Sequence, residues 1–363
     1  MPSELHVPND CDLYEAISNI DEYGTIYLSN GIYSLSGDLT ICKPLNIQGE
    51  ECDQPAIIET SVNSSIVIET YGLVSMTHIR VVDVFVLPSI PITVNNGKLD
   101  LYRCLITSRN KGTENNFLYN MCGILLLNDS VIEMKLCRIS NQLNGIRLCN
   151  NAKASITKCI ISDNSASGIY SKDTSTINVN SSKIQNNGST GVIDSSESST
   201  VLIDCNISGN VRNGIAIYSQ NAMIKKCFIV SNRRYGIAII DSLNSEIIEN
   251  EVNLNYQDGI LIQGKSSPLL SDNKCESNRE AGIVYIREAT GTAERNLCRK
   301  NKYGIHVMNS ASPDLIGNVC ESNQLNGILF TDESGGSAIG NICIDNTEDI
   351  ISITKNALPI IID

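Results

Sequence analysis

The sequence predicts an all-β fold, a parallel β-helix whose coils repeat about every 22–23 residues. Glycine followed by isoleucine or valine recurs once per coil, at Gly123, Gly145, Gly168, Gly191, Gly214, Gly236, Gly259, Gly282, Gly304 and Gly327. An asparagine series has the same spacing, at Asn141, Asn164, Asn187, Asn210, Asn232, Asn255, Asn278, Asn301, Asn323 and Asn346. Self-similarity at a fixed period of this length indicates a solenoid, in which each repeat buries its apolar face against its neighbours.

The segments between the repeated residues are too short for helices. They hold runs of three to five residues that alternate between apolar and polar side chains, such as Ile215–Ile217 and Ala222–Lys225. Asn, Ser and Gly bound these runs, which is typical of strands. A leucine-rich repeat of similar length needs a recurring leucine framework, and only scattered leucines occur.

Stacked strands place equivalent residues of successive coils directly above one another, so each column is expected to hold similar side chains. One column holds Cys137, Cys159, Ser182, Cys205, Cys227, Asn250, Asn273, Asn296, Asn318 and Asn341. Two residues further on, a second column holds Ile139, Ile161, Ile184, Ile207, Ile229, Val252, Cys275, Cys298, Cys320 and Cys343. The cysteines are therefore expected to be small inward-facing hydrophobes. No CxxC pairs or histidine-rich clusters accompany them, and we expect no metal and no cofactor.

Both repeated series are expected to be structural. An asparagine stacked at a corner can hydrogen-bond through its amide to the asparagines above and below, and it tolerates left-handed backbone angles. The glycine that follows is expected to supply another unusual backbone angle without a steric cost.

Composition indicates which partners the protein is not expected to bind and in which cellular compartment it is expected. The chain has 363 residues and a formal net charge of −13, which argues against nucleic acid as a partner. No apolar run approaches the roughly 20 residues needed to cross a bilayer, so membrane insertion is not expected. The start of the sequence has no basic and apolar signal region. Because most cysteines are expected inside as free thiols, the sequence predicts a cytoplasmic protein.

The chain divides into four segments in order. Residues 1–50 form an N-terminal cap and the first coil, with apolar spacing at 12–20 that predicts a short amphipathic helix. Residues 51–122 form irregular coils with an inserted loop at about 109–121. The regular coils follow at 123–349, and 350–363 form a C-terminal cap. The insertion is either a tolerated surface loop or a partner-contacting loop, since Phe117, Leu118 and Tyr119 are costly to expose.

Two early motifs resemble those of a known group of proteins. After the helix come G-T-I-Y-L-S-N-G-I-Y at 24–33 and L-T-I-C-K-P-L-N-I-Q-G-E at 39–50. This order resembles the opening of right-handed parallel β-helix proteins of the pectin-lyase-like superfamily, and it implies a right-handed coil capped by the helix. The later G-I repeats are similar to CASH-type repeats, as in F-box β-helix receptors and SHC-binding spindle β-helix proteins. That resemblance implies a recognition platform.

The superfamily also contains lyases, hydrolases and epimerases of acidic polysaccharides, which carry characteristic catalytic motifs. The sequence has no D-D, G-H-G or R-I-K segment of the polygalacturonase type, and no pectate lyase motif. Asp241, Asp258, Glu280 and His306 are expected to be surface residues. We therefore expect no catalytic residues and a non-catalytic scaffold for a protein partner. The alternatives are a carbohydrate-binding or polysaccharide-active β-helix, for which at least three carboxylates must converge within two coils, and a purely structural rod.

A binding edge is predicted at the turn before each repeated glycine. Arginine and tyrosine are favoured interface anchors, and this turn collects them on an acidic protein, at Arg212, Arg233, Arg234, Tyr235, Tyr256, Arg279 and Tyr303. Beside it, the outward position after each G-I is mostly apolar. That column is either an exposed contact stripe or a set of strand-forming residues on a flat sheet that a loop covers.

Overall fold

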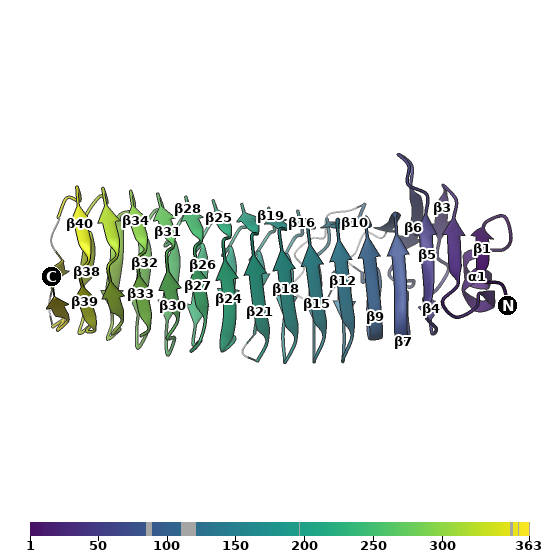
Figure 1. Cartoon of the computed structure of the whole chain (residues 1–363). Helices are drawn as coiled ribbons and strands as arrows, with labels where there is room; N and C mark the ends of the chain where they lie inside the picture. Colours follow the sequence, from purple (N-terminus) through teal and green to yellow (C-terminus); the bar gives the residue numbers. More distant parts are fainter. Residues whose placement is uncertain (85–88, 110–120, 196, 349–350, 355, 363) are drawn as a thin grey trace. The chain divides into compact units, whose positions relative to one another are not determined.

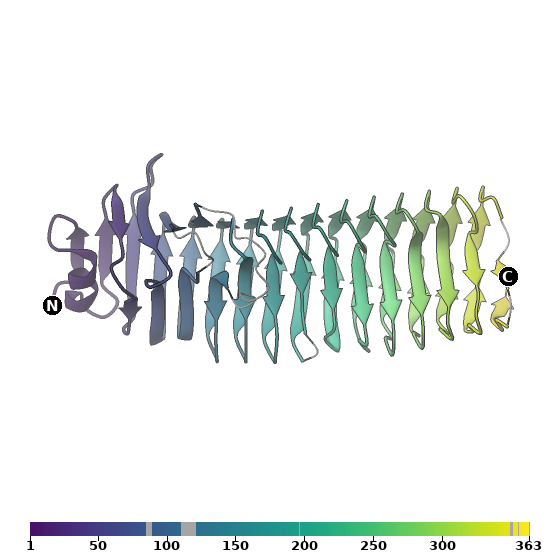
Figure 2. The ribbon, with the colours of Figure 1, turned by 180° about the vertical axis from the view of Figure 1, so that it is seen from behind.

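The chain folds into two compact units, unit 1 (Met1–Lys183) and unit 2 (Ile184–Asp363). The computed structural model describes residues 1–84, 89–109, 121–195, 197–348, 351–354 and 356–362. Within each unit the chain winds into coils of three sides, and parallel strands stack coil upon coil (Figure 1; Figure 2). We number the sides first, second and third in chain order. Among the described residues, no helix is long and apolar enough to span a membrane.

Unit 1 contains the helix that the sequence predicted at residues 12–20. The helix α1 (Leu13–Asn19) begins after Asp12, whose carboxylate accepts a hydrogen bond from the Glu15 amide at 2.9 Å. This is an ordinary N-cap, because the aspartate satisfies an otherwise unpaired amide of the first turn. Leu13, Ala16 and Ile17 form the buried face of the helix, and the helix contacts β1 (Glu4–Val7). The helix therefore covers apolar side chains of the first coil.

The strands of unit 1 form three parallel stacks. The first side holds β1, β2 (Thr25–Leu28), β5 (Leu45–Gly49), β12 (Val131–Lys135), β15 (Lys153–Thr157) and β18 (Thr176–Asn180). The second side holds β3 (Ile32–Ser34), β6 (Ala56–Thr60), β8 (Ile79–Asp83), β10 (Leu105–Ser108), β13 (Arg138–Ser140) and β16 (Ile160–Ser162). The third side holds β4 (Leu39–Ile41), β11 (Cys122–Leu126), β14 (Asn144–Leu148) and β17 (Ile169–Ser171). Two long strands, β7 (Ile66–Thr77) and β9 (Ile92–Tyr102), run from the third side into the first.

Unit 2 repeats the same three sides with shorter strands. Its first side holds β21 (Ser199–Ile203), β24 (Asn221–Lys225), β27 (Glu246–Ile248), β30 (Leu269–Ser271), β33 (Thr292–Glu294), β36 (Asp314–Ile316), β39 (Ser337–Ile339) and β42 (Ile360–Ile362). Its second side holds β22 (Asn206–Ser208), β25 (Phe228–Val230), β28 (Glu251–Asn253), β31 (Lys274–Glu276), β34 (Leu297–Arg299), β37 (Val319–Glu321) and β40 (Ile342–Ile344). Its third side holds β20 (Val192–Ile193), β23 (Ile215–Ile217), β26 (Ile237–Ile240), β29 (Ile260–Gln263), β32 (Ala281–Ile286), β35 (Tyr303–Met308), β38 (Ile328–Phe330) and β41 (Ser352–Ile353). The strand β19 (Lys183–Gln185) spans the boundary between the units.

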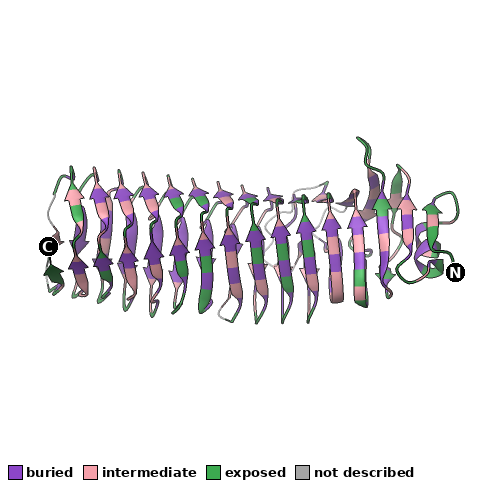
Figure 3. Ribbon diagram, viewed as in Figure 1, coloured by how far each residue is buried: buried purple, intermediate pink, exposed green. Residues whose placement is uncertain are grey.

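Along most strands, buried and more exposed residues alternate (Figure 3). Two predicted columns line the interior of unit 2. In the second column, Cys275, Cys298 and Cys320 stack in register and are fully buried. All fourteen cysteines are free thiols. The inward-facing thiols therefore act as small apolar side chains, as the column pattern predicted.

The asparagine ladder of unit 2 is confirmed as a buried hydrogen-bonded stack. The side-chain amide of Asn232 donates to the Asn255 side-chain oxygen at 3.1 Å, and Asn255 donates in the same way to Asn278 at 3.0 Å. The amide groups of the column beginning at Asn250 are joined likewise, at 2.9 Å to Asn273. The same amide of Asn232 also donates to the backbone carbonyl of Ile207 in the preceding coil, so the buried amide is satisfied.

Three details of this prediction were wrong. The left-handed residue is the one before each ladder asparagine, for example Ser231 with φ 56° before Asn232. In unit 1, Asn141 is itself the left-handed corner residue with φ 59°. Gln142 stands at the ladder position, and its backbone N–H donates to the Asn164 side-chain oxygen. The repeated glycines do not adopt positive φ.

Steric crowding explains the repeated glycine instead. A Cβ atom on Gly236 would lie 2.4 Å from Val252 Cγ1 and 2.7 Å from the Gly259 carbonyl oxygen. Glycine is therefore required because successive coils pack tightly here, with the backbone of one coil against that of the next.

Two predicted segments fall partly or wholly outside the described residues. Most of the insertion at 109–121, with Phe117, Leu118 and Tyr119, lies outside them. Parts of the segment 350–363 do so as well. The division of the chain into four segments stays a prediction.

Candidate functional site

The outward face of the first side of unit 1 carries two columns of polar and aromatic side chains. Parallel register stacks the residues of the corner column, His6, Tyr27, Gln48, Thr77, Tyr102, Lys135 and Thr157. Two residues earlier in each strand lies the middle column, Glu4, Thr25, Asn46, Ser75, Asp100, Glu133 and Ser155. We call the two columns together the unit 1 face. Alternation along each strand turns these residues outward, while their neighbours fill the core.

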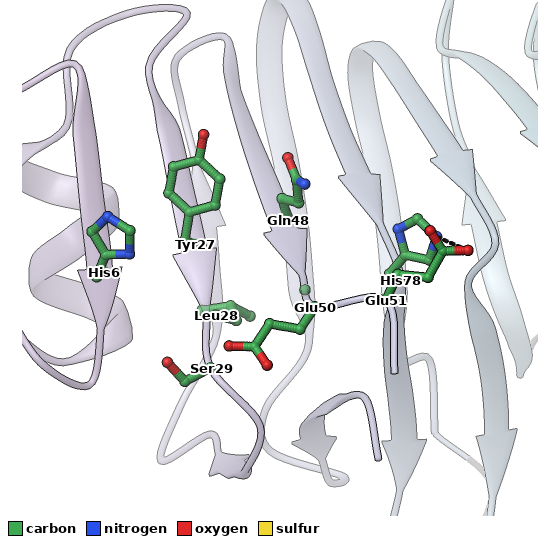
Figure 4. A pocket seen from close by; sticks show the side chains of 9 residues that line it. His6, Tyr27, Leu28, Ser29, Gln48, Glu50, Glu51 and His78 are labelled. Carbon is green, nitrogen blue, oxygen red and sulfur yellow. Dashed lines mark ion pairs between the residues drawn. The ribbon is translucent and has the colours of Figure 1, made fainter. Parts of the chain in front are cut away.

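The first hollow on the unit 1 face has a volume of about 250 Å³. His6, Tyr27 and Gln48 line it from successive strands (Figure 4). The rings of His6 and Tyr27 are stacked, with centroids 4.9 Å apart and planes inclined by 16°. Glu50 lies on the loop that borders the same hollow. An aromatic surface thus stands beside amide and carboxylate groups, which is a common combination in ligand sites.

A charged cluster lies at the corner beside this hollow. The loop 50–55 between β5 and β6 brings Glu51 over the next coils, where its Oε1 atom lies 3.7 Å from His78 Nε2 (Figure 4). Glu51 is also ion-paired with Arg103. The His78 ring meets Tyr102 edge-on, with centroids 5.8 Å apart, and the Arg103 guanidinium lies 5.4 Å from the centre of the Tyr102 ring. The cluster therefore fixes Tyr102 from two directions.

A second hollow of about 360 Å³ lies further along the unit 1 face. Its rim consists of hydroxyl, carboxylate and amino groups from both columns, namely Ser75, Thr77, Asp100, Tyr102, Glu133, Lys135, Ser155 and Thr157. Asp100 and Glu133 are directly paired across β9 and β12. Hydroxyl, amide and aromatic groups can hold a polyhydroxylated ligand, and two adjacent carboxylates can transfer protons.

Sequence reasoning missed this face. The residues of its corner column follow one another at uneven intervals, because loops of different length separate the strands of unit 1. A search for one fixed period therefore does not detect it. Thr77, Tyr102 and Lys135 each precede a left-handed residue that ends a strand, which aligns them in the structure, but no common residue type marks these corners in the sequence. His78 and Tyr102 could have been singled out only after that alignment.

The predicted binding edge lies on unit 2. Arg212, Arg233, Arg234, Tyr256 and Arg279 are exposed or partly exposed, and Tyr235 and Tyr303 are half-buried. Hydrogen bonds between coils bring some of them together, for example from the Arg234 amide to the Arg212 carbonyl at 3.1 Å. Neither the fold nor the contacts test binding at this edge, so it stays a prediction.

The apolar column beside that edge is covered and does not form an exposed stripe. Ala238, Leu261, Ala281 and Val284 form a buried cluster on the outer face of the third side. The residues that pack over it are Tyr235, Ile240, Ile286 and Tyr303. The tyrosines of the turn thus bury the column themselves.

Two residues that were expected at the surface are partly buried in unit 2. The Asp258 carboxylate accepts a hydrogen bond from the Ala281 amide at 2.8 Å, and burial raises its pKa to about 6. His306 lies between Val284 and Leu329 in the column, and burial lowers its pKa to about 4. Asp241 is exposed, as predicted.

The solved structures similar to this chain include enzymes named for alginate and for α-1,3-glucan. A double mutant of the periplasmic alginate epimerase AlgG has a TM-score of 0.60 at 13% identity, over 98% of this chain and 83% of that one. The T-to-N single mutant of the same epimerase scores 0.55 at 13% identity, with the same coverage. The catalytic unit of a GH87 α-1,3-glucanase from Streptomyces thermodiastaticus strain HF3-3 scores 0.52 at 14% identity, over 95% of this chain and 64% of that one. No curated protein matches the sequence.

These similarities contradict the expected non-catalytic scaffold and its protein partner. The similar proteins process alginate or α-1,3-glucan, which favours the polysaccharide-active alternative. For this chain that alternative remains a proposal, since identities of 13% and 14% show the fold alone.

The family follows from a direct match to the sequence. The model of the right-handed beta helix region matches residues 92–200 and 167–319, which together are more than half of the chain. The match agrees with the three-sided parallel coils of both units. The chain therefore belongs to the right-handed β-helix family.

Proposed function

We propose that this protein binds a polysaccharide over the unit 1 face and acts on it. The observation that carries the proposal is the pair of outward columns, which present one polar or aromatic side chain per coil over seven strands. A polysaccharide is itself a repeating chain, so a surface that repeats along the coil can contact several of its sugar units. Hydroxyl, amide and aromatic groups are the partners that sugar hydroxyls and the apolar faces of sugar rings need.

The fold-level similarity supports the same proposal as an analogy. An alginate epimerase and an α-1,3-glucanase share the architecture, although a fold by itself does not fix an activity. The G-I and asparagine spacing supports a kinship with CASH-type repeats, which concerns the architecture of the repeat and not the chemistry of the site.

Removal of the stacked aromatic ring in the first hollow tests the proposal. We expect Tyr27→Ala to weaken binding to the preferred polysaccharide at least tenfold, about 1.4 kcal/mol, because the sugar loses its ring contact and His6 loses its stacking partner. Affinity electrophoresis in gels containing α-1,3-glucan, β-1,3-glucan, mannan or alginate measures this change.

Tyr71→Ala is the matched control, because Tyr71 is 95% exposed in unit 1 and lies outside the two columns. The control is expected to bind as the wild type does. A wild-type protein that is retarded by none of the four polysaccharides would contradict the proposed function.

A further inference from the structure

The second hollow of the unit 1 face contains two carboxylates joined by one amino group. Lys98 lies two residues before Asp100 on the same face of β9, and its Nζ atom is 2.7 Å from Glu133 Oε1. The same Nζ atom is 3.7 Å from Asp100 Oδ1. The distance between these two carboxylate oxygens therefore cannot exceed the sum of their distances to Nζ.

The two carboxylates have different surroundings. Glu133 is the more exposed side chain, at 55% against 32% for Asp100, and it holds the short contact to the Lys98 ammonium. Burial raises the pKa of Asp100 above its ordinary value; the Lys98 charge acts in the opposite direction, and the Glu133 charge adds to the increase. Asp100 is thus the candidate proton donor, and Glu133, which the Lys98 ammonium contacts, is the candidate nucleophile.

Such a pair is the working group of most glycoside hydrolases, and its spacing decides the stereochemistry. Carboxyl groups about 5–5.5 Å apart give retention through a covalent intermediate, whereas inversion needs about 6.5–9.5 Å to admit a water molecule. The two Lys98 contacts keep one oxygen of each carboxyl group closer together than the inverting range. Asp100 and Glu133 are also directly paired on adjacent strands, and this closeness favours the retaining geometry. Hydroxyl groups of Ser75 and Ser155, on either side in the same column, can contact the sugar units next to the reacting bond.

We propose that Asp100 and Glu133 hydrolyse a glycosidic bond of a neutral polysaccharide with retention of configuration. This inference rests on the proposed polysaccharide site of the unit 1 face. In the first step Asp100 donates its proton to the glycosidic oxygen as the bond from that oxygen to the anomeric carbon breaks, and a Glu133 oxygen bonds to the same carbon. In the second step water attacks this carbon, gives a proton to Asp100 and releases Glu133 as a carboxylate. Both carboxyl groups return to their starting states.

Charge selects the class of polysaccharide. The chain carries a formal net charge of −13, which disfavours association with a polyanion. Lys98 is already paired with both carboxylates of the hollow, and Lys135 is the remaining amino group on its rim. The other rim groups are uncharged hydroxyls, which suit a neutral chain of sugars.

The experiment measures the release of reducing ends by the full chain from α-1,3-glucan, β-1,3-glucan, mannan and alginate. We expect cleavage of at least one of the three neutral polymers and none of alginate. Asp100→Asn and Glu133→Gln are each expected to lower the rate at least about 100-fold, the usual size of a general acid or nucleophile effect. Proton NMR of the first product is expected to show the anomer of the bond that was cut.

Glu246→Gln is the matched control, because Glu246 occupies the middle-column position of a first-side strand in unit 2 and is exposed. Its activity is expected to equal that of the wild type. Circular dichroism and the unfolding midpoint establish that each variant is folded. For a variant that is not folded, Asp100→Ser or Glu133→Ser takes its place.

Inverted product, full activity in both carboxylate variants, or the absence of cleavage from all neutral polymers would overturn the inference. A wild-type protein that binds one of these polymers without cutting it leaves the proposed binding function intact and refutes only the hydrolysis.

Discussion

The two units carry different side chains at one position of the coil, the residue immediately before the left-handed corner that ends the first side. In unit 1 this residue is Thr77, Tyr102, Lys135, Thr157 or Asn180 in successive coils. At the seven such corners that the structure describes in unit 2, it is isoleucine in four, Ile203, Ile248, Ile316 and Ile339. Side chains that can hydrogen-bond or stack are thus concentrated on unit 1, while the same position of unit 2 is mainly aliphatic.

The interiors of the units also differ, but here it is unit 2 that carries the hydrogen-bonding side chain in every coil. Unit 2 repeats one hydrogen-bonded asparagine in every coil from Asn187 to Asn346. In unit 1, buried Thr60 and Asp83 are paired neighbours at the ends of β6 and β8 and do not repeat a common side chain. The difference teaches that a regular interior fixes the backbone of unit 2, whereas irregular loops in unit 1 bring groups such as Glu51 over the face.

The largest expected effect comes from removing one rung of the unit 2 ladder. Asn278→Ala deletes the oxygen that accepts from both the main-chain and side-chain N–H groups of Asn255, and the amide that donates to the Val252 carbonyl. Buried groups left without partners cost about 1–3 kcal/mol each, so we expect a loss of about 3–5 kcal/mol in the free energy of unfolding. Urea denaturation followed by circular dichroism measures it.

Two controls sharpen the comparison between the interiors. Asn221→Ala removes an exposed asparagine of unit 2 and is expected to change stability by no more than about 0.5 kcal/mol. Thr60→Val replaces a buried hydroxyl that has no hydrogen-bond partner among the described residues, and it is expected to be neutral or stabilising. An Asn278→Ala variant as stable as the wild type would show that the ladder does not hold unit 2 together.

The regular part of the fold could be predicted because stacking forces the sequence to repeat. The spacing of Gly236 and Asn255 with their equivalents located the coils of unit 2 and the ladder. The role of the glycine was misjudged, since crowding against Val252 and the Gly259 carbonyl depends on the distance between coils, which the sequence does not state.

The candidate site could not be predicted in the same way. Asp100 and Glu133 are far apart in the sequence, and only the register between β9 and β12 makes them neighbours. The position of Glu51 over His78 and Arg103 depends on the path of the loop 50–55, for which the sequence has no periodic signal. Side chains that repeat are visible in a sequence, whereas a constellation used once is visible only in space.

The second largest effect concerns Asp258, whose burial in unit 2 is expected to make stability depend on pH. Its pKa is raised from 3.8 to about 6, so between these values the folded chain binds more protons than the unfolded chain does. The contribution of Asp258 to stability therefore falls as pH rises from about 4 to about 6, and it is constant above that. A shift of this size corresponds to about 2–3 kcal/mol.

Asp258→Asn removes the titrating charge and keeps an oxygen that can accept from the Ala281 amide. We expect the variant to match the wild type near pH 4 and to be about 2–3 kcal/mol more stable at pH 7, as measured by thermal unfolding at several pH values. The control Asp345→Asn alters an exposed aspartate of unit 2 and is expected to change stability by no more than about 0.5 kcal/mol. Equal stability of Asp258→Asn and wild type at pH 7 would contradict the burial of this carboxylate.

The smallest change in the free energy of unfolding is expected for a variant that tests the two faces directly. This variant gives a corner position of unit 1 the residue that unit 2 favours. Tyr102→Ile places an isoleucine at the corner position, as at Ile248, and removes the ring that both His78 and Arg103 contact. Since the side chain is only half-buried and isoleucine suits a strand, we expect stability to change by less than about 1 kcal/mol. Polysaccharide binding in affinity gels is expected to weaken about tenfold, about 1.4 kcal/mol.

The reciprocal change in unit 2 decides what the result of Tyr102→Ile means. Ile248→Thr gives unit 2 a polar corner residue like Thr77 and is expected to leave binding unchanged, because Ile248 lines neither of the two hollows of the unit 1 face. If both variants weaken binding equally, the polysaccharide contacts both units, and the contrast between their faces does not locate the site. If only Tyr102→Ile does so, the chemical variety of the unit 1 face is what the ligand recognises, and the aliphatic face of unit 2 contributes to folding alone.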